Sequence, residues 1–344
     1  MIPFYRVILK RALNISWKNK WLWILGFFAA FLGNSTVYEA LLRSLNNLSE
    51  NKSIFSVFKE YGQLGIIGLL SWNNLKVLWQ SDPTSFGISL FVILAFLSTV
   101  ALLICASIIS QGGLIRSSIL LDSGVKVKFK DAFSAGIKYF WRILGVNFIT
   151  KIIFFGILLL FAYLVSLLSF NNQVVSLLIY IFAMIIFVVL GIIIYFLTVY
   201  GTAFVVLRDK KVVVALKEAW HVFSRHVVLN MEMGLILFVI NILAACAFFI
   251  GAFIALAPSI ILYVIFIFAG FAAGVKAMAI IILIVFLTLL VLLGAWYYSF
   301  QVSAWSILFE ELALRGGKSK ILRVYEQLKG KLPKRKLPAN LDKR

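Results

Sequence analysis

Residues 152–207 read IIFFGILLLFAYLVSLLSFNNQVVSLLIYIFAMIIFVVLGIIIYFLTVYGTAFVVL, without a single Asp, Glu, Lys or Arg. A helix needs about 20 apolar residues to cross the roughly 30 Å of hydrocarbon in a bilayer. The stretch is therefore long enough for two membrane-spanning helices. Only Asn171, Asn172 and Gln173 interrupt its apolar character, and we expect them to form a tight polar turn between the two helices.

The composition of the whole chain agrees with this interpretation. Of its 344 residues, 63% are hydrophobic and 13% are charged, whereas globular proteins average about 45–50% and about 25%. So few charged residues cannot cover a water-facing surface of this size. The composition therefore excludes a soluble protein and predicts an all-α, polytopic transmembrane helical bundle.

Three further charge-free stretches are also long enough to span a membrane: residues 83–115, with an apolar centre at 87–110, residues 233–275, which Pro258 and Ser259 interrupt, and residues 277–309. Residues 21–33 form a shorter apolar run, which we still expect to span. A cleaved signal peptide is the alternative. It is disfavoured because residues 1–20 precede this run and no convincing small-residue cleavage site follows it.

Basic residues alternate with neutral connections along the chain. Residues 1–20, 112–142, 208–226 and 310–344 carry 27 of the 33 Lys and Arg residues, whereas residues 34–86 carry four basic and four acidic residues. By the positive-inside rule, the N-terminus, the basic connections and the tail are cytoplasmic. We expect a multi-pass protein of the bacterial plasma (inner) membrane with both termini in the cytoplasm.

The number of crossings depends on residues 258–276. Counting them as a full span gives seven crossings and places the basic tail outside, against the positive-inside rule. Six crossings keep the tail in the cytoplasm. Residues 258–276 are then either a re-entrant or interfacial segment, or an extension of long tilted helices.

The chain contains an internal repeat. An amphipathic stripe of apolar or small residues precedes the second pair of spans, and it recurs in register at residues 212–223 and, less completely, at residues 9–20. In the second pair the stripe consists of Phe129, Ala132, Phe133, Gly136, Ile137 and Phe140. Each stripe directly precedes a span. We therefore predict three hairpin units and a tail, at residues 1–111 (with an external loop at 34–86), 112–207, 208–311 and 312–344.

Two of the three stripes share a recurring entry, ALNISW at residues 12–17 and ALKEAW at 215–220, while the middle copy has Ala132 and Gly136 without the Trp. In this respect the chain resembles bacterial multi-pass proteins typified by the membrane domain of glycerophosphodiester phosphodiesterases and its uncharacterised relatives. The resemblance covers the helical chain and implies a multi-span helical fold. It implies no chemistry, because the catalytic barrel of some relatives has no counterpart here.

Amphipathic basic helices at the start of each unit favour contact with anionic lipid headgroups on the cytoplasmic face. The candidate lipid-interface residues are Trp17, Trp141, Trp220, Lys10, Lys138 and Arg225. The alternative is that the stripes pack on neighbouring spans as ordinary core.

The net charge of +20 points to membrane lipid as the partner and not to nucleic acid, because most of the charges lie between or beyond the apolar segments. Protein partners and the oligomeric state cannot be read from the sequence.

Two ionisable residues are expected inside the spans, where a charge costs about 2.5–3.5 kcal/mol. Lys151 and Glu232 fall at similar depths on equivalent helices. We predict that they form an intramembrane polar pair, with Asn147, Asn230 and Asn241 around them. The alternative is that both are structural, as an ordinary salt bridge or as side chains that extend to the interface.

Catalytic and metal-binding motifs are not found. His221 and His226 are five positions apart instead of the four that favour a shared metal, and Cys105 and Cys246 lie in apolar runs. We expect no enzyme activity, no catalytic residue, no cofactor and no metal. The interpretation is a non-catalytic membrane module that interacts with lipid. The alternative is a membrane transporter that uses Lys151 and Glu232.

Overall fold

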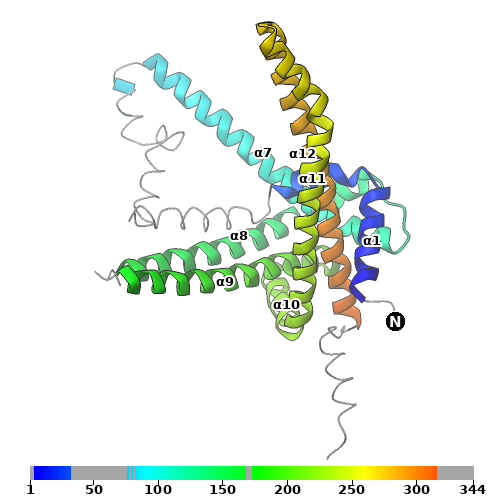
Figure 1. The fold of residues 1–344 in the computed structure, drawn as a ribbon. Coiled ribbons are helices and arrows are strands. Elements are labelled where there is room, and N and C mark those ends of the chain that lie inside the picture. The colour runs from blue at the N-terminus through cyan, green and yellow to red at the C-terminus, as the bar shows by residue number, and fades with distance from the viewer. Residues whose placement is uncertain (1–3, 32–75, 77–78, 81–82, 168–172, 316–344) are drawn as a thin grey trace, which may run out of the picture.

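A computed structural model describes residues 4–31, 76, 79–80, 83–167 and 173–315. Within these residues every regular element is a helix, as the sequence predicts (Figure 1). The helices are α1 (Phe4–Lys18), α2 (Leu22–Ala30), α7 (Pro83–Asp122), α8 (Phe129–Leu167), α9 (Gln173–Arg208), α10 (Val212–Arg225), α11 (Val227–Phe268) and α12 (Ala272–Arg315). The predicted polar turn at 171–173, most of the loop at 34–86 and the tail at 312–344 lie largely outside the described residues.

Five of the described helices are long and apolar enough to cross a membrane. They lie within α7, α8, α9, α11 and α12, which contain 36 to 44 residues each. At 1.5 Å per residue these helices are about 54 to 66 Å long, roughly twice the hydrocarbon thickness of a bilayer. The helices are therefore compatible with an integral membrane protein, but only part of each is needed to span it.

The inner parts of the long helices pack together with α1, α2 and α10, and we call this body the hub. It comprises these three short helices, residues 107–122 of α7, 129–150 of α8, 194–208 of α9, 227–245 of α11 and 295–312 of α12. Large side chains that are almost fully buried fill its core, among them Ile8, Leu25, Tyr200 and Phe309. Burial of this apolar surface is the main term that stabilises the hub.

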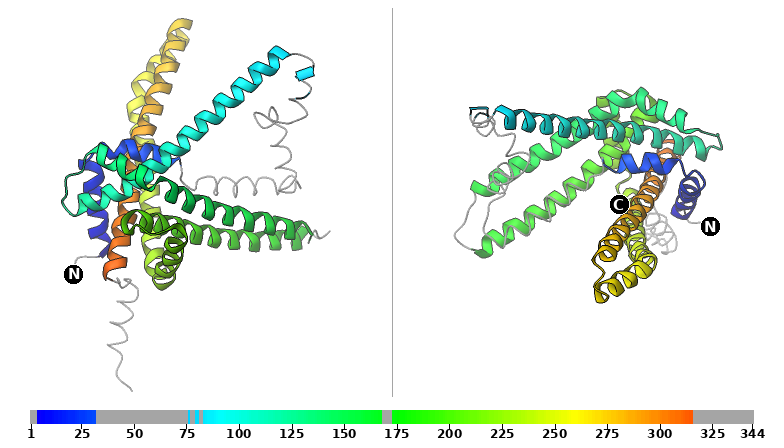
Figure 2. Two further views of the ribbon diagram at one scale, coloured as in Figure 1. Left: turned by 180° about the vertical axis from the view of Figure 1, so that it is seen from behind. Right: turned by 90° about the horizontal axis from the view of Figure 1, so that it is seen from above.

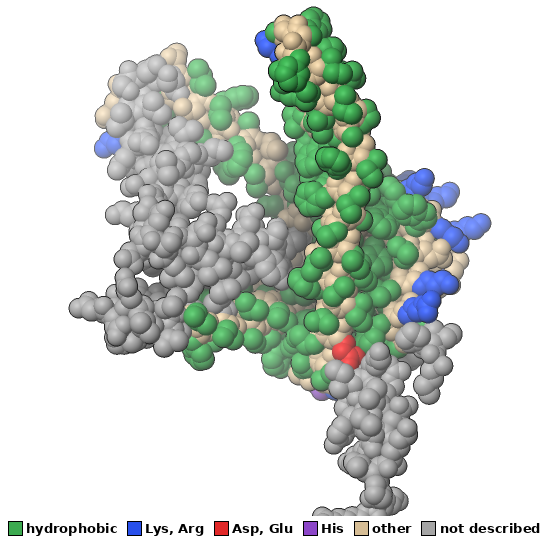
Figure 3. All heavy atoms as spheres, viewed as in Figure 1, with side chains coloured by type: hydrophobic (Ala, Val, Ile, Leu, Met, Phe, Trp, Pro, Cys, Tyr) green, Lys and Arg blue, Asp and Glu red, His purple; other side chains and the backbone are tan. Residues whose placement is uncertain are grey.

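The outer parts of the long helices form arms that leave the hub in different directions (Figures 1 and 2). The arms are residues 86–106, 151–167, 173–193, 246–268 and 272–294. Each is close to the length of roughly 20 residues that a transmembrane helix needs. Among the arm residues whose side chains the structure describes, most of the large apolar ones are exposed. In Figure 3 the arm of α11 and α12 is almost wholly hydrophobic as far as its tip.

The hub helices cross closely where small residues meet. A Cβ atom added at Gly136 of α8 would lie 2.0 Å from the carbonyl oxygen of Ile109 on α7. A Cβ atom added at Gly26 of α2 would lie 2.3 Å from the carbonyl oxygen of Ala295 on α12. Such contacts place backbone against backbone, so a larger residue would push the helices apart.

In each predicted unit, the helical segment that precedes the first span packs on the last long helix of another unit. The inner half of α8 packs on α7, α10 packs on α9, and α1 packs on α12. The contact of α1 with α12 joins the two ends of the described chain.

Residues 258–276 complete α11 and begin α12, and their placement relative to a membrane stays a prediction. Helix α11 continues through Pro258, and the chain turns at Gly270, whose φ of +67° lies in the left-handed region that glycine favours. The first predicted span is described only in part: α2 has nine residues, and the residues after 31 lie outside the described ranges.

Candidate functional site

The three predicted interface tryptophans are all on the surface of the hub. Trp17 on α1 is 59% exposed, Trp141 on α8 is 77% exposed and Trp220 on α10 is 50% exposed. A large aromatic side chain at such exposure loses most of the apolar burial that a water-soluble protein would give it. Tryptophan is enriched where a protein meets the headgroup region of a bilayer.

The predicted basic interface residues Lys10, Lys138 and Arg225 are exposed as well. They lie on the same three helical segments as the tryptophans. The opposite faces of α1 and α10 are buried: Ala12 of the ALNISW entry and Ala215 of the ALKEAW entry are both 0% exposed. Each segment therefore presents one face to the hub core and a mixed basic and aromatic face outward.

Glu232 and Lys151 have different surroundings. The Tyr5 hydroxyl of α1 donates a hydrogen bond to the Glu232 carboxylate. Lys151 is half-buried on α8, where its neighbours Ile152 and Ile153 are exposed. The pairing of Lys151 with Glu232 stays a prediction.

The asparagines predicted around that pair do not share one environment. Asn230 is fully buried in the hub and accepts a hydrogen bond of 2.5 Å from the Tyr200 hydroxyl. The Asn147 amide is buried on α8 and donates to Gln111 at 3.1 Å. Asn241 is exposed on α11. The first two therefore join helices within the hub.

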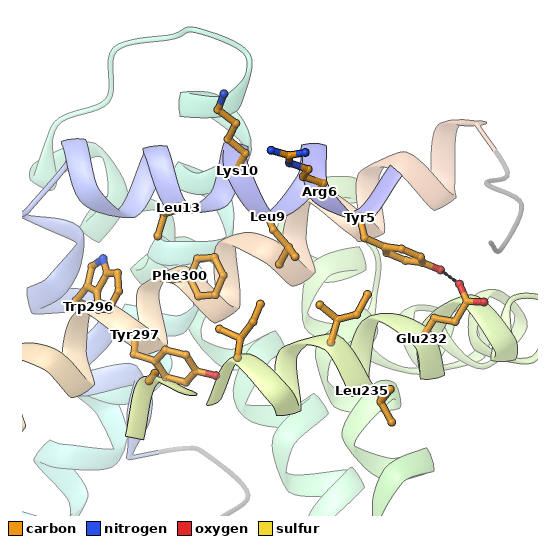
Figure 4. A pocket seen from close by; sticks show the side chains of 13 residues that line it. Tyr5, Arg6, Leu9, Lys10, Leu13, Glu232, Leu235, Trp296, Tyr297 and Phe300 are labelled. Carbon is orange, nitrogen blue, oxygen red and sulfur yellow. Dashed lines mark hydrogen bonds between the residues drawn. The ribbon is translucent and has the colours of Figure 1, made fainter. Parts of the chain in front are cut away.

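A groove of about 740 Å³ lies between α1, α11 and α12, and the sequence did not reveal it (Figure 4). Thirteen residues line it: Tyr5, Arg6, Leu9, Lys10, Leu13, Glu232, Leu235, Ile236, Ile240, Ala244, Trp296, Tyr297 and Phe300. Two of them, Lys10 and Glu232, were singled out from the sequence. The walls are otherwise mainly aliphatic or aromatic, and the volume is in the range of a small-molecule site.

The polar groups of the groove sit at its rim. Leu9 and Leu13 point from α1 toward α11 and α12, while Arg6 and Lys10 extend from the other side of α1 (Figure 4). Neither Arg6 nor Lys10 forms an ion pair with any described residue. The lining therefore combines two basic side chains, Arg6 and Lys10, with the acidic side chain of Glu232.

Comparisons with known family models, curated proteins and solved structures gave no match. The site must therefore be interpreted from its own chemistry.

A cluster of charged residues ties α1 to the ends of two long helices. Arg11 of α1 forms a salt bridge and hydrogen bonds with Asp122 at the end of α7, and its Nη1 atom lies 3.1 Å from Glu311 of α12. Hydrogen bonding to Asp122 is the main cause that raises the pKa of Arg11, although burial acts in the opposite direction. Sequence reasoning missed this cluster because 111 and 300 positions separate the partners.

The described residues do not contain a group of three or more His, Cys, Asp or Glu side chains that could hold a metal ion. What the hub offers chemically is an apolar groove with a cationic rim and exposed aromatic side chains. Such features are typical of surfaces that contact amphiphiles, whose chains are apolar and whose headgroups are polar or charged.

Proposed function

We propose that this protein is a non-catalytic membrane module whose hub engages lipid at the cytoplasmic face. The observation that carries the proposal is the exposure of Trp17, Trp141 and Trp220 beside exposed basic residues on three separate helical segments. Three such segments provide three interfacial contacts around one hub. Membrane-surface helices combine aromatic and basic residues in this way because the aromatics enter the headgroup region and the cations meet anionic lipid.

The proposal includes three repeated units, each with an interfacial helix followed by a span outward and a span back, and therefore six crossings. Equivalent small residues support the repeat: Ala12, Ala132 and Ala215 are between 0% and 1% exposed. The packing order supports it too, because each interfacial segment packs on the last helix of another unit. The likeness to the glycerophosphodiester phosphodiesterase membrane domain belongs to this proposal.

We place the hub at the inner surface of a bacterial plasma membrane, with both termini in the cytoplasm. Arms of roughly 20 residues match the hydrocarbon thickness, and Lys276, near the start of α12, lies at the far end of the arm that α11 and α12 form. The basic side chains gathered beside α1 in Figure 3 belong to the hub end. Positive charge collects on the cytoplasmic side of membrane proteins.

Quenching of tryptophan fluorescence by lipid tests the proposal. The protein is reconstituted into vesicles whose lipids carry bromine on the acyl chains near the headgroup. We expect strong quenching that falls in the triple variant Trp17→Phe, Trp141→Phe, Trp220→Phe. The control Trp305→Phe should keep the quenching of the native protein, because Trp305 is only 4% exposed within the hub. Equal quenching in the triple variant and the native protein would refute contact with lipid at these positions.

Transport is the alternative that the sequence left open, and it requires a polar cavity at bilayer depth lined by Lys151 or Glu232. Glu232 lines the groove, but the groove walls are mainly apolar. Lys151 is not among the lining residues of this groove. The described residues therefore favour a lipid-binding module over a transporter.

A further inference from the structure

The groove between α1, α11 and α12 has the dimensions of one lipid chain. Its lining on α11 extends from Glu232 to Ala244, a rise of about 18 Å along the helix. One leaflet of a bilayer has a hydrocarbon depth of about 15 Å. The lining of α1 runs in parallel, because Tyr5 meets Glu232 at one end and Leu13 lies toward Trp296 and Tyr297 at the other (Figure 4).

The apolar floor of the groove is continuous. Leu9, Ile236, Ile240 and Phe300 come from three helices and line the same space. If this apolar floor stayed exposed to water, the protein would forgo about 25 cal/mol of stabilising free energy for every Å² left exposed. An apolar chain removes that surface from water or from loosely packed lipid, so the groove favours an occupant with a hydrocarbon chain.

The rim of the groove selects the charge of the occupant. Arg6 and Lys10 belong to the lining, are exposed and extend outward from α1. Within the described residues neither of them is neutralised by a carboxylate. Among the described residues that line the groove, Glu232 is the one carboxylate, and the Tyr5 hydroxyl donates a hydrogen bond to it at the end of the groove. Two cations near a headgroup attract a phosphate, because the Coulomb energy is larger at a membrane surface than in bulk water.

We propose that this groove is a binding site for one anionic phospholipid, with an acyl chain on the apolar floor and the headgroup phosphate at Arg6 and Lys10. This inference rests on the proposed function, since it assumes that the hub lies against the cytoplasmic leaflet. It goes further by assigning one lipid class to one site. The lipid joins α1 to the α11 and α12 hairpin and becomes part of the packing of the hub.

Mass spectrometry of the intact protein with its retained lipids tests the site. The protein is purified in a mild detergent with equal amounts of phosphatidylglycerol and phosphatidylcholine, and the retained lipids are weighed. We expect one phosphatidylglycerol per chain to be retained in preference to phosphatidylcholine. The variant Arg6→Gln, Lys10→Gln should lower this preference about thirtyfold, since each cation near a membrane surface adds about a fivefold gain. Glu232→Gln should raise the preference, because it removes the acid beside the phosphate site.

Two controls make the result decisive. Lys126→Gln with Lys128→Gln removes the same charge from an exposed connection that does not line the groove, and it should leave the preference unchanged. Ala244→Trp fills the groove with a side chain suited to membrane surroundings and should reduce retention of either lipid. Because Ala244→Trp changes no charge, it remains informative if the Arg6 and Lys10 variant fails to fold.

The two experiments test the lipid site and the proposed function separately. If the Arg6 and Lys10 variant keeps the preference of the Lys126 and Lys128 control, or if Ala244→Trp retains lipid like the native protein, the site assignment is wrong. The quenching experiment at the three exposed tryptophans does not use the groove. A fall in quenching in the triple variant together with unchanged lipid retention therefore overturns the site alone, whereas equal quenching in the native protein and the triple variant overturns the proposed function.

Discussion

Glycine residues on one helix can have opposite roles, and α8 contains both kinds. Gly136 lies where α8 crosses α7, and an added Cβ atom there would lie 2.0 Å from the Ile109 carbonyl oxygen. Gly156 lies on the arm, and nothing is within 4 Å of an added Cβ atom there. The difference arises from tertiary packing, since both positions are helical.

Gly136→Ala should destabilise the protein by about 1–3 kcal/mol, because the added methyl group must push two backbones apart. Gly156→Ala, the matched control, should leave stability equal or raise it by up to about 1 kcal/mol, because alanine loses less backbone entropy in a helix. Unfolding by a detergent denaturant, followed by circular dichroism, measures both. A Gly136→Ala variant as stable as Gly156→Ala would show that this crossing is looser than described.

Arg11 places its charge between two helices of the hub, next to Asp122 of α7 and Glu311 of α12. The side chains of its partners Asp122 and Glu311 are 6% and 15% exposed, while its own is 36% exposed. Removing one member of a fully buried ion pair costs roughly 3–5 kcal/mol. Partial exposure of Arg11 lowers this cost through screening by solvent.

Arg11→Met should therefore destabilise the protein by about 2 kcal/mol, and adding Asp122→Asn should recover part of that loss. The control is Arg142→Met, because the Arg142 and Asp209 side chains of that pair are 41% and 62% exposed. The control should cost less than about 1 kcal/mol. Thermal unfolding of the four proteins in one detergent provides the comparison. Equal losses for Arg11→Met and Arg142→Met would contradict a special role for Arg11.

At the scale of elements, His226 separates the short helix α10 from the long helix α11. It lies between α10 and α11, at φ −126° and ψ 33°, outside the helical region. Burial is the main cause that lowers its pKa, followed by the nearby charges of Arg225 and His221. The folded protein therefore favours the neutral form of this histidine.

The sign of the pH effect follows from that lowered pKa. The unfolded chain binds a proton near the ordinary histidine pKa of about 6.5, before the folded chain does. The contribution of His226 to the free energy of unfolding should be complete above that pH. It should decrease as the pH falls from there toward the lower pKa of the folded protein. His226→Gln should flatten this profile between about pH 7.5 and about pH 5, while His221→Gln should keep most of the slope. Chemical denaturation across this range checks the prediction, and an unchanged slope in His226→Gln would disprove it.

At the scale of the whole molecule, the hub and the arms differ in which side chains they bury and which they expose. The hub buries polar side chains such as Ser118 and Ser303, whose hydroxyl oxygens lie 2.9 Å apart, together with the Arg11 cluster. The arms expose mainly apolar side chains. Lipid is the solvent in which such apolar arms are stable.

Labelling of introduced cysteines can measure on which side of the membrane the hub lies and on which side the tip of the α11 and α12 arm lies. In a background with Cys105→Ala and Cys246→Ala, we expect a membrane-impermeant maleimide to label Lys276→Cys in intact cells. Ser123→Cys, in the connection between α7 and α8, should react only after the cells are permeabilised. The reverse pattern would invert the orientation that the positive charges predict.

Local properties of the chain were enough to predict its solvent and its secondary structure. Charge-free runs such as residues 152–207 predicted long helices, because apolar length and helical periodicity involve only neighbouring residues. The sequence also named Trp17, Trp141 and Trp220 as candidate interface residues, and the structure exposes all three. These properties need no knowledge of which helix lies beside which.

The groove, the close crossings, the Arg11 cluster and the directions of the arms depend instead on long-range packing. Tyr5 and Glu232 are 227 positions apart, and nothing in the spacing of either residue indicates the other. Within a membrane many helix pairings bury similar apolar area, so hydropathy does not choose among them. The choice depends on small residues such as Gly26 and Gly136 that allow close approach, and on a few charges that pair across the hub.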